Sequence, residues 1–210
     1  MRARILYGGS FDPPTLGHRA VLEIARRAFP RAEIMVVPAG WQPQKDPDRV
    51  RPAELRLEMA RLAFGDLPGL RVSDEECLRP GRSYTVDTLR AQAEGLRALP
   101  PDQRPQLYLL MGSDSTLSLP GWREPRQILQ LARVLTVPRP GFDPKAIQEL
   151  PGFTRQEKEA LLEGVLPEEA PPISSTEVRA RLQAGKSVEG LVAPRVLAFI
   201  QKEGLYRPRS

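Results

Sequence analysis

The alternation of short apolar runs with amphipathic segments is the feature that most limits how this chain can fold. Five mostly apolar runs predict buried parallel strands, at residues 4–7, 33–37, 70–72, 106–111 and 134–137. Apolar residues at helical spacing predict helices between them, at residues 17–29, 53–64, 86–99 and 123–132. Successive parallel strands require right-handed crossover connections. We therefore expect an α/β fold, a Rossmann-like doubly wound parallel sheet with helices on both faces.

The last third of the chain has a different pattern. Three more helices are predicted at residues 154–162, 174–183 and 192–203, with an extended segment at 167–172. No internal repeat and no linker divides the chain, and 210 residues suit one medium domain. We predict a single domain over residues 1–210, with the sheet core at about 1–140 and a mainly helical C-terminal part at about 141–210.

Charge and cysteine content limit the partners and the compartment. The 31 Lys and Arg against 26 Asp and Glu indicate anionic partners, although a basic surface that keeps the protein soluble explains the excess equally well. One cysteine excludes an intramolecular disulfide and favours a reducing compartment. No apolar stretch is long enough to span a membrane, and the start enters a predicted strand directly. We expect a cytoplasmic protein without a membrane partner.

Two further compositional features bear on nucleic-acid binding and on heat tolerance. The cations are scattered among glutamates and aromatic residues make up only 6%, which argues against a nucleic-acid-binding module. The chain has 23 prolines and no asparagine, a profile typical of a heat-tolerant (thermophile) protein or of codon usage in a G+C-rich genome. The sequence leaves open which explanation applies, and it leaves a homo-oligomer open.

A glycine-rich segment, Gly-Gly-Ser-Phe-Asp-Pro-Pro-Thr-Leu-Gly-His, joins the first predicted strand to the first helix and ends at His18. In an open parallel sheet, ligands bind beyond the carboxyl ends of the strands. Gly8 and Gly9 allow close backbone approach, and their N–H groups with those of Ser10 and Phe11 can form an anion cradle. His18, the only histidine, stands at a helix start, where the dipole favours phosphate.

A second segment, Ile-Ser-Ser-Thr-Glu-Val-Arg, begins at Ile173 and opens a C-terminal helix. Ser174 or Ser175 is a good N-cap, and Glu177 completes a capping box with Ser174, which explains the pattern on structural grounds. The same hydroxyls, the free N–H groups and Arg179 can instead hold a polyphosphate.

Together, Gly9-Ser-Phe-Asp-Pro, Thr15-Leu-Gly-His and Ile173-Ser-Ser-Thr-x-x-Arg resemble the signature of the nucleotidyltransferase superfamily related to class I aminoacyl-tRNA synthetases. The resemblance implies transfer of AMP or CMP onto a phosphate, with catalytic roles for His18, Thr15 and Arg179. It implies that ATP is bound by Gly8, Gly9, Ser10, Phe11, His18, Gly112, Asp114, Ile173, Ser174, Ser175, Thr176 and Arg179.

The middle of the chain most resembles the bacterial nicotinate-mononucleotide adenylyltransferase family, over residues 5–206. The similar stretches include Ser83-Tyr-Thr-Val-Asp-Thr-Leu, Met111-Gly-Ser-Asp and Arg139-Pro-Gly. The resemblance implies ATP and nicotinate mononucleotide as substrates. Four residues are candidates for the mononucleotide. Trp122 can stack on the pyridine ring, the helix start at Thr85 can receive the carboxylate, and Lys45 or Arg56 can meet the phosphate; a solvated helix face is the alternative for Arg56.

One position departs from this family. Its members usually carry histidine where this chain has Thr15, and threonine is usual in phosphopantetheine adenylyltransferases. That enzyme therefore stays an alternative, as does a nicotinamide-mononucleotide adenylyltransferase. We expect Mg²⁺ to be held by the ATP phosphates and water, without a dedicated protein site.

Overall fold

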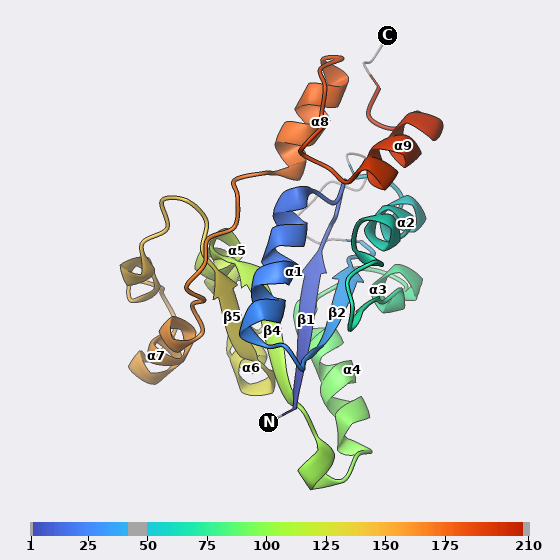
Figure 1. The fold of residues 1–210 in the computed structure, drawn as a ribbon. Helices are drawn as coiled ribbons and strands as arrows, with labels where there is room; N and C mark the ends of the chain where they lie inside the picture. The colour runs from blue at the N-terminus through green and yellow to red at the C-terminus, as the bar shows by residue number, and fades with distance from the viewer. Residues whose placement is uncertain (1, 42–49, 208–210) are drawn as a thin grey trace.

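The computed structural model describes residues 2–41 and 50–207. It contains a five-stranded parallel sheet with strand order β3-β2-β1-β4-β5 (Figure 1). The strands are β1 (Ala3–Gly9), β2 (Glu33–Pro38), β3 (Leu70–Val72), β4 (Gln106–Gly112) and β5 (Arg133–Val137). The predicted Rossmann-like α/β fold and its parallel sheet are therefore confirmed.

The helices follow the predicted order. The predicted ones are α1 (Leu16–Ala28), α2 (Ala53–Phe64), α4 (Thr85–Arg97), α6 (Pro125–Leu131), α7 (Arg155–Glu163), α8 (Ser175–Gln183) and α9 (Pro194–Lys202). The structure adds short elements without a prediction, α3 (Glu75–Leu78), α5 (Ser113–Ser118) and the 3₁₀ turns η2 (Pro101–Gln103), η3 (Leu119–Gly121) and η4 (Pro144–Ile147). They are too short to show a helical period.

Helices cover both faces of the sheet, and the side chains of β1 alternate between the two layers. Ile5 and Tyr7 join one buried cluster with α1, α2 and α9, whereas Leu6 joins the other with α4 and α6. Val178 of α8 and Ile200 of α9 belong to the first cluster. The helices α8 and α9 therefore share a core with the sheet, and Figure 1 shows α9 beside α2.

The strand order creates a switch point beside β1. From this central strand the chain first builds β2 and β3 on one side, and later β4 and β5 on the other. Connections therefore leave the carboxyl ends of β1 and β4 in opposite directions, and a crevice opens between them. In such a sheet this crevice is where ligands bind.

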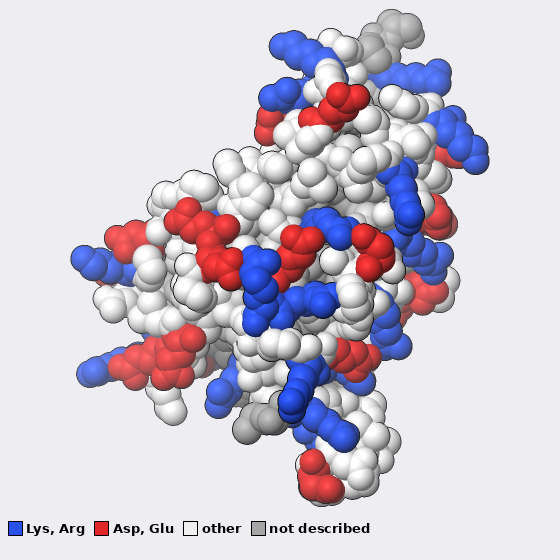
Figure 2. Space-filling model, viewed as in Figure 1, with Lys and Arg blue, Asp and Glu red and all other residues white. Residues whose placement is uncertain are grey.

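Opposite charges alternate on the surface. Figure 2 shows basic and acidic side chains interspersed over the face viewed in Figure 1. Arg19 pairs with Asp66, and Arg27 pairs with Glu168. Within the described ranges, no helix has both the length and the hydropathy needed to cross a membrane.

Candidate active site

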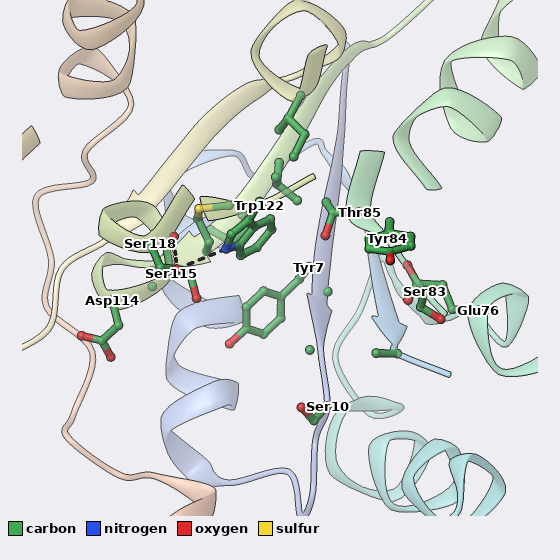
Figure 3. A pocket seen from close by; sticks show the side chains of 18 of the residues that line it. Tyr7, Ser10, Glu76, Ser83, Tyr84, Thr85, Asp114, Ser115, Ser118 and Trp122 are labelled. Carbon is green, nitrogen blue, oxygen red and sulfur yellow. Dashed lines mark hydrogen bonds between the residues drawn. The ribbon is translucent and has the colours of Figure 1, made fainter. Parts of the chain in front are cut away.

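A cavity of about 380 Å³, which we call the central cavity, opens at the carboxyl ends of β1 and β4. Its lining comes from the end of β1, the end of β4, the start of α4, and the segments around Trp122 and Arg139. Among the described residues, eight predicted site residues line it: Gly8, Gly9, Ser10, His18, Thr85, Gly112, Asp114 and Trp122. Figure 3 labels four of them, Ser10, Thr85, Asp114 and Trp122. The fold thus joins candidates that stand more than 100 residues apart in the sequence.

His18 is oriented by Thr15, the N-cap of α1. The backbone N–H of His18 donates to Thr15 Oγ1 at 3.3 Å, and the backbone N–H of Thr15 donates to His18 Nδ1 at 3.0 Å. A nitrogen that accepts this bond carries no proton, so the neutral ring bears its proton on Nε2. His18 can therefore offer an Nε2–H donor at a helix start that lines the central cavity.

Thr15 and Phe11 both contact His18, and neither lines the central cavity. Thr15 is 2% exposed, so its expected catalytic role is corrected to a positioning role through Nδ1 of His18. Phe11 is also buried, and its ring edge packs against His18 with 5.2 Å between ring centroids. A Cβ on Gly9 would lie 2.9 Å from the Phe11 ring, so this arrangement requires glycine there.

The second motif lies directly against the first. Ser175 Oγ donates to the Pro13 carbonyl at 2.8 Å, and Arg179 Nη1 donates to the Asp12 carbonyl at 2.6 Å. The α1 start approaches so closely that a Cβ on Gly17 would meet the carbonyl of residue 173 at 2.6 Å. The two helix starts that were predicted to hold the phosphates of ATP are therefore neighbours.

The side chains of the second motif have structural partners. They adjoin the first motif and are absent from the lining of the central cavity: Ile173, Ser174, Ser175, Thr176 and Arg179. Ser174 Oγ accepts from the backbone N–H of Glu177 at 3.1 Å, as predicted for an N-cap. The reciprocal half of the expected capping box is wrong, because the Glu177 carboxylate pairs with Arg181 at 2.9 Å.

The structure corrects both roles that the sequence suggested for Arg56. Its side chain is 2% exposed, so the solvated helix face is wrong. Its three guanidinium nitrogens donate to the backbone carbonyls of Arg51, Ser10 and Gly40, and burial lowers its pKa. The expected contact with the mononucleotide phosphate is also corrected, because these bonds hold the loops after β1 and β2 together. Lys45, the other phosphate candidate, lies outside the described residues.

Trp122 and Thr85 line the end of the central cavity that lies away from Ser10 (Figure 3). The indole Nε1 of Trp122 donates to Ser118 Oγ at 3.2 Å, which fixes one edge of the ring. Thr85 is the first residue of α4, and the preceding residue Tyr84 makes no side-chain capping bond to the helix. The first N–H groups of this 13-residue helix thus lie beside the cavity, where a carboxylate would satisfy them.

Several lining residues were missed by sequence reasoning. Arg139 follows β5, pairs with Asp114 at 3.2 Å and lies against Gly112; its place at a strand end is a usable signal. Tyr7 precedes Gly8 in β1 and has the same signal. The sequence carries no such signal for Glu76, because this residue lies in α3, a helix of only four residues. Its carboxylate is buried and accepts from Thr88 at 2.5 Å, and burial raises its pKa.

The fold and this cavity define a nucleotide-binding α/β protein, and residues 6–181 match the family described as Cytidylyltransferase-like. Two relatives carry the name "Probable nicotinate-nucleotide adenylyltransferase". The one from Roseiflexus sp. (strain RS-1) is 40% identical over 205 residues, covering 96% of each chain. One from Thermus thermophilus is 39% identical over 204 residues, covering 96% of this chain and 98% of the relative. The chain therefore belongs to the nicotinate-nucleotide adenylyltransferase family.

Solved structures agree on the fold. The Plasmodium falciparum nicotinic acid mononucleotide adenylyltransferase complexed with NaAD has a TM-score of 0.73 to this chain. The same enzyme complexed with APC has a TM-score of 0.71. Each is 20% identical, and the alignment covers 98% of both chains. At this identity the likeness establishes the shared architecture.

Proposed function

We propose that this protein transfers AMP from ATP to nicotinate mononucleotide, giving deamido-NAD and pyrophosphate in NAD biosynthesis. The names of its relatives support this reaction. The observation that carries the proposal is the central cavity, which connects an Nε2–H donor at the α1 start to an indole and an uncapped helix start at its far end. A phosphate fits the first place, and a flat ring with a carboxylate fits the second.

The proposed chemistry needs positioning and charge stabilisation. An oxygen of the acceptor phosphate attacks the α-phosphorus of ATP in line, while the bond to the bridging oxygen breaks and pyrophosphate leaves with the electron pair. No protein side chain becomes covalently linked. His18 Nε2–H donates to the α-phosphate as negative charge builds on its oxygens. Trp122 and the α4 start hold the ring end of the acceptor.

The neighbouring starts of α1 and α8 suit the β- and γ-phosphates, with Arg179 one turn into α8. We propose that Mg²⁺ enters with ATP and offsets charge on the phosphates. In the part of the chain that the structure describes, no three His, Cys, Asp or Glu side chains cluster as metal ligands. We propose that phosphate oxygens and water supply the ligands of this ion.

The test is pyrophosphate release from ATP and Mg²⁺ with three acceptors: nicotinate mononucleotide, nicotinamide mononucleotide and 4′-phosphopantetheine. We expect the highest kcat/KM with nicotinate mononucleotide, by about tenfold or more over the amide, because one charge-assisted hydrogen bond is worth at least about 1.4 kcal/mol. A preference for 4′-phosphopantetheine would overturn the proposal and favour the alternative that Thr15 keeps open.

Replacing Trp122 with alanine should raise the KM for the mononucleotide by about tenfold, because the loss of stacking on a ring costs about 1–3 kcal/mol. Trp122→Phe should raise it less, since a flat ring is kept. Trp41→Ala is the matched control, because Trp41 is 44% exposed and lies outside the cavity lining. Steady-state kinetics with ATP saturating gives the comparison. An unchanged KM in Trp122→Ala would remove Trp122 from the site.

Replacing Arg179 with alanine should raise the KM for ATP and lower kcat, together costing about 2 kcal/mol of transition-state stabilisation. The guanidinium is held by the Asp12 carbonyl and by Thr176 Oγ1, so its charge stands at the junction of the two motifs. Arg181→Ala is the control from the same helix, since Arg181 pairs with Glu177 at the surface. Equal kinetics in the two variants would contradict the role of Arg179.

A further inference from the structure

Tyr7 directs its hydroxyl into the central cavity. It is 6% exposed, it belongs to β1 and it lines the central cavity. Among residues 2–41 and 50–207, its hydroxyl makes no hydrogen bond. Figure 3 shows its ring among the lining side chains, with the hydroxyl directed away from β1.

Within the described residues, the hydroxyl is not among the fully buried side-chain atoms that lack a hydrogen-bond partner, so it is accessible from the cavity. The ring is packed against Phe11, with 5.6 Å between centroids, and stands 6.4 Å from the ring of His18. The other deeply buried tyrosine shows the usual solution, since Tyr206 donates to the carboxylate of Asp12 at 2.5 Å. Within the described residues Tyr7 has no such partner, so its hydroxyl is available to a ligand in the cavity.

The surroundings of Tyr7 specify the chemistry of that partner. Burial raises the pKa of Tyr7, and the nearby positive charge of Arg139 only partly opposes this. The phenol is then neutral at physiological pH and offers an O–H donor, so it suits an acceptor oxygen of a ribose or phosphate. Figure 3 shows Tyr7 between Trp122 and Ser10, and the ring of Tyr7 also stands close to the ring of His18.

We propose that the Tyr7 hydroxyl donates a hydrogen bond to the ribose-phosphate part of the bound nicotinate mononucleotide. This inference rests on the proposed function, because only an acceptor that spans from Trp122 to His18 places its ribose and phosphate beside Tyr7. Tyr7 is then a substrate-binding residue that holds the attacking phosphate in register with the α-phosphate of ATP.

The experiment compares Tyr7→Phe with the unaltered protein. Loss of one neutral hydrogen bond should raise the KM for nicotinate mononucleotide by about 3- to 10-fold and leave the KM for ATP within about twofold. Without ligand, Tyr7→Phe should melt at about the same temperature, because within the described residues the hydroxyl makes no hydrogen bond that the variant would lose. The stabilisation by added mononucleotide should be smaller.

Tyr108→Phe is the matched control. Tyr108 lies in β4, packs against Phe29 and is absent from the cavity lining, so both KM values should stay unchanged.

Three results would overturn the inference: an unchanged KM for the mononucleotide in Tyr7→Phe, a rise in the KM for ATP instead, or a lower melting temperature without ligand. If the unaltered protein does not use nicotinate mononucleotide, the proposed function fails and this inference fails with it. If the unaltered protein does use it and Tyr7→Phe matches it, only the inference fails.

Discussion

Replacing His18 with alanine should lower kcat by about 10²- to 10³-fold, which corresponds to about 2.7–4 kcal/mol of transition-state stabilisation. The reason is geometric. Thr15 donates its N–H to Nδ1 and so leaves the proton on Nε2, the nitrogen that can reach a phosphate. A donor that is already oriented when charge develops stabilises the transition state more than the ground state. The KM values for both substrates should therefore change less than kcat.

The His18→Ala result needs a control for folding, because His18 also takes part in the capping box of α1. Thr15 keeps its role as N-cap in this variant, so the free energy of unfolding should fall by no more than about 1 kcal/mol. Urea denaturation of both proteins measures this loss. A kcat close to that of the unaltered protein would remove His18 from the chemistry, whatever the change in stability.

Replacing Arg56 with methionine should lower the free energy of unfolding by about 3–5 kcal/mol, because three backbone carbonyls each lose a charged hydrogen-bond donor. The Ser10 and Gly40 carbonyls accept at 2.8 and 2.7 Å, and they belong to the two loops on either side of Arg56. For a chain of this length the melting temperature should fall by roughly 10 °C. Methionine keeps much of the volume, so lost hydrogen bonds account for most of the change.

Arg61→Met is the matched control for Arg56→Met. Arg61 stands in the same helix, its side chain is 50% exposed, and its ion pairs with Glu58 and Asp74 are long, at 4.0 and 3.7 Å. Such exposed pairs contribute at most about 1 kcal/mol. Calorimetry or urea denaturation of the two variants gives the comparison. A loss below about 1 kcal/mol in Arg56→Met would contradict the structural role that its three bonds indicate.

The prediction of the fold succeeded for a physical reason. A parallel strand covered on both faces is apolar throughout, and a helix on such a sheet repeats its apolar residues every three to four positions. Both patterns are visible in a single segment. The helices α3 and α5 were missed because they have 4 and 6 residues, fewer than two turns. Glu76, in α3, was missed as a lining residue for the same reason.

The prediction of the site was less complete, as Arg56, Thr15 and Tyr7 show. An arginine in an amphipathic helix is typical of a solvated face, yet Arg56 is buried by loops that follow two different strands. Thr15 was expected to be a catalytic residue, and instead it orients the ring of His18. The place of Tyr7 near a strand end indicates a site residue, but only the packing around its ring directs the hydroxyl into the cavity.

The sequence by itself determined the parallel sheet and the helix starts that carry the two motifs, because periodicity, capping and glycine placement act within a few residues. The tertiary structure alone decided that Ser175 and Arg179 meet the loop before His18, and that a shared cavity joins His18 to Trp122. The hydrogen-bond partners of these side chains lie on other strands and helices. The role of a buried polar side chain therefore depends on groups distant in the sequence. They either supply its hydrogen-bond partners or leave its polar atoms available to a ligand.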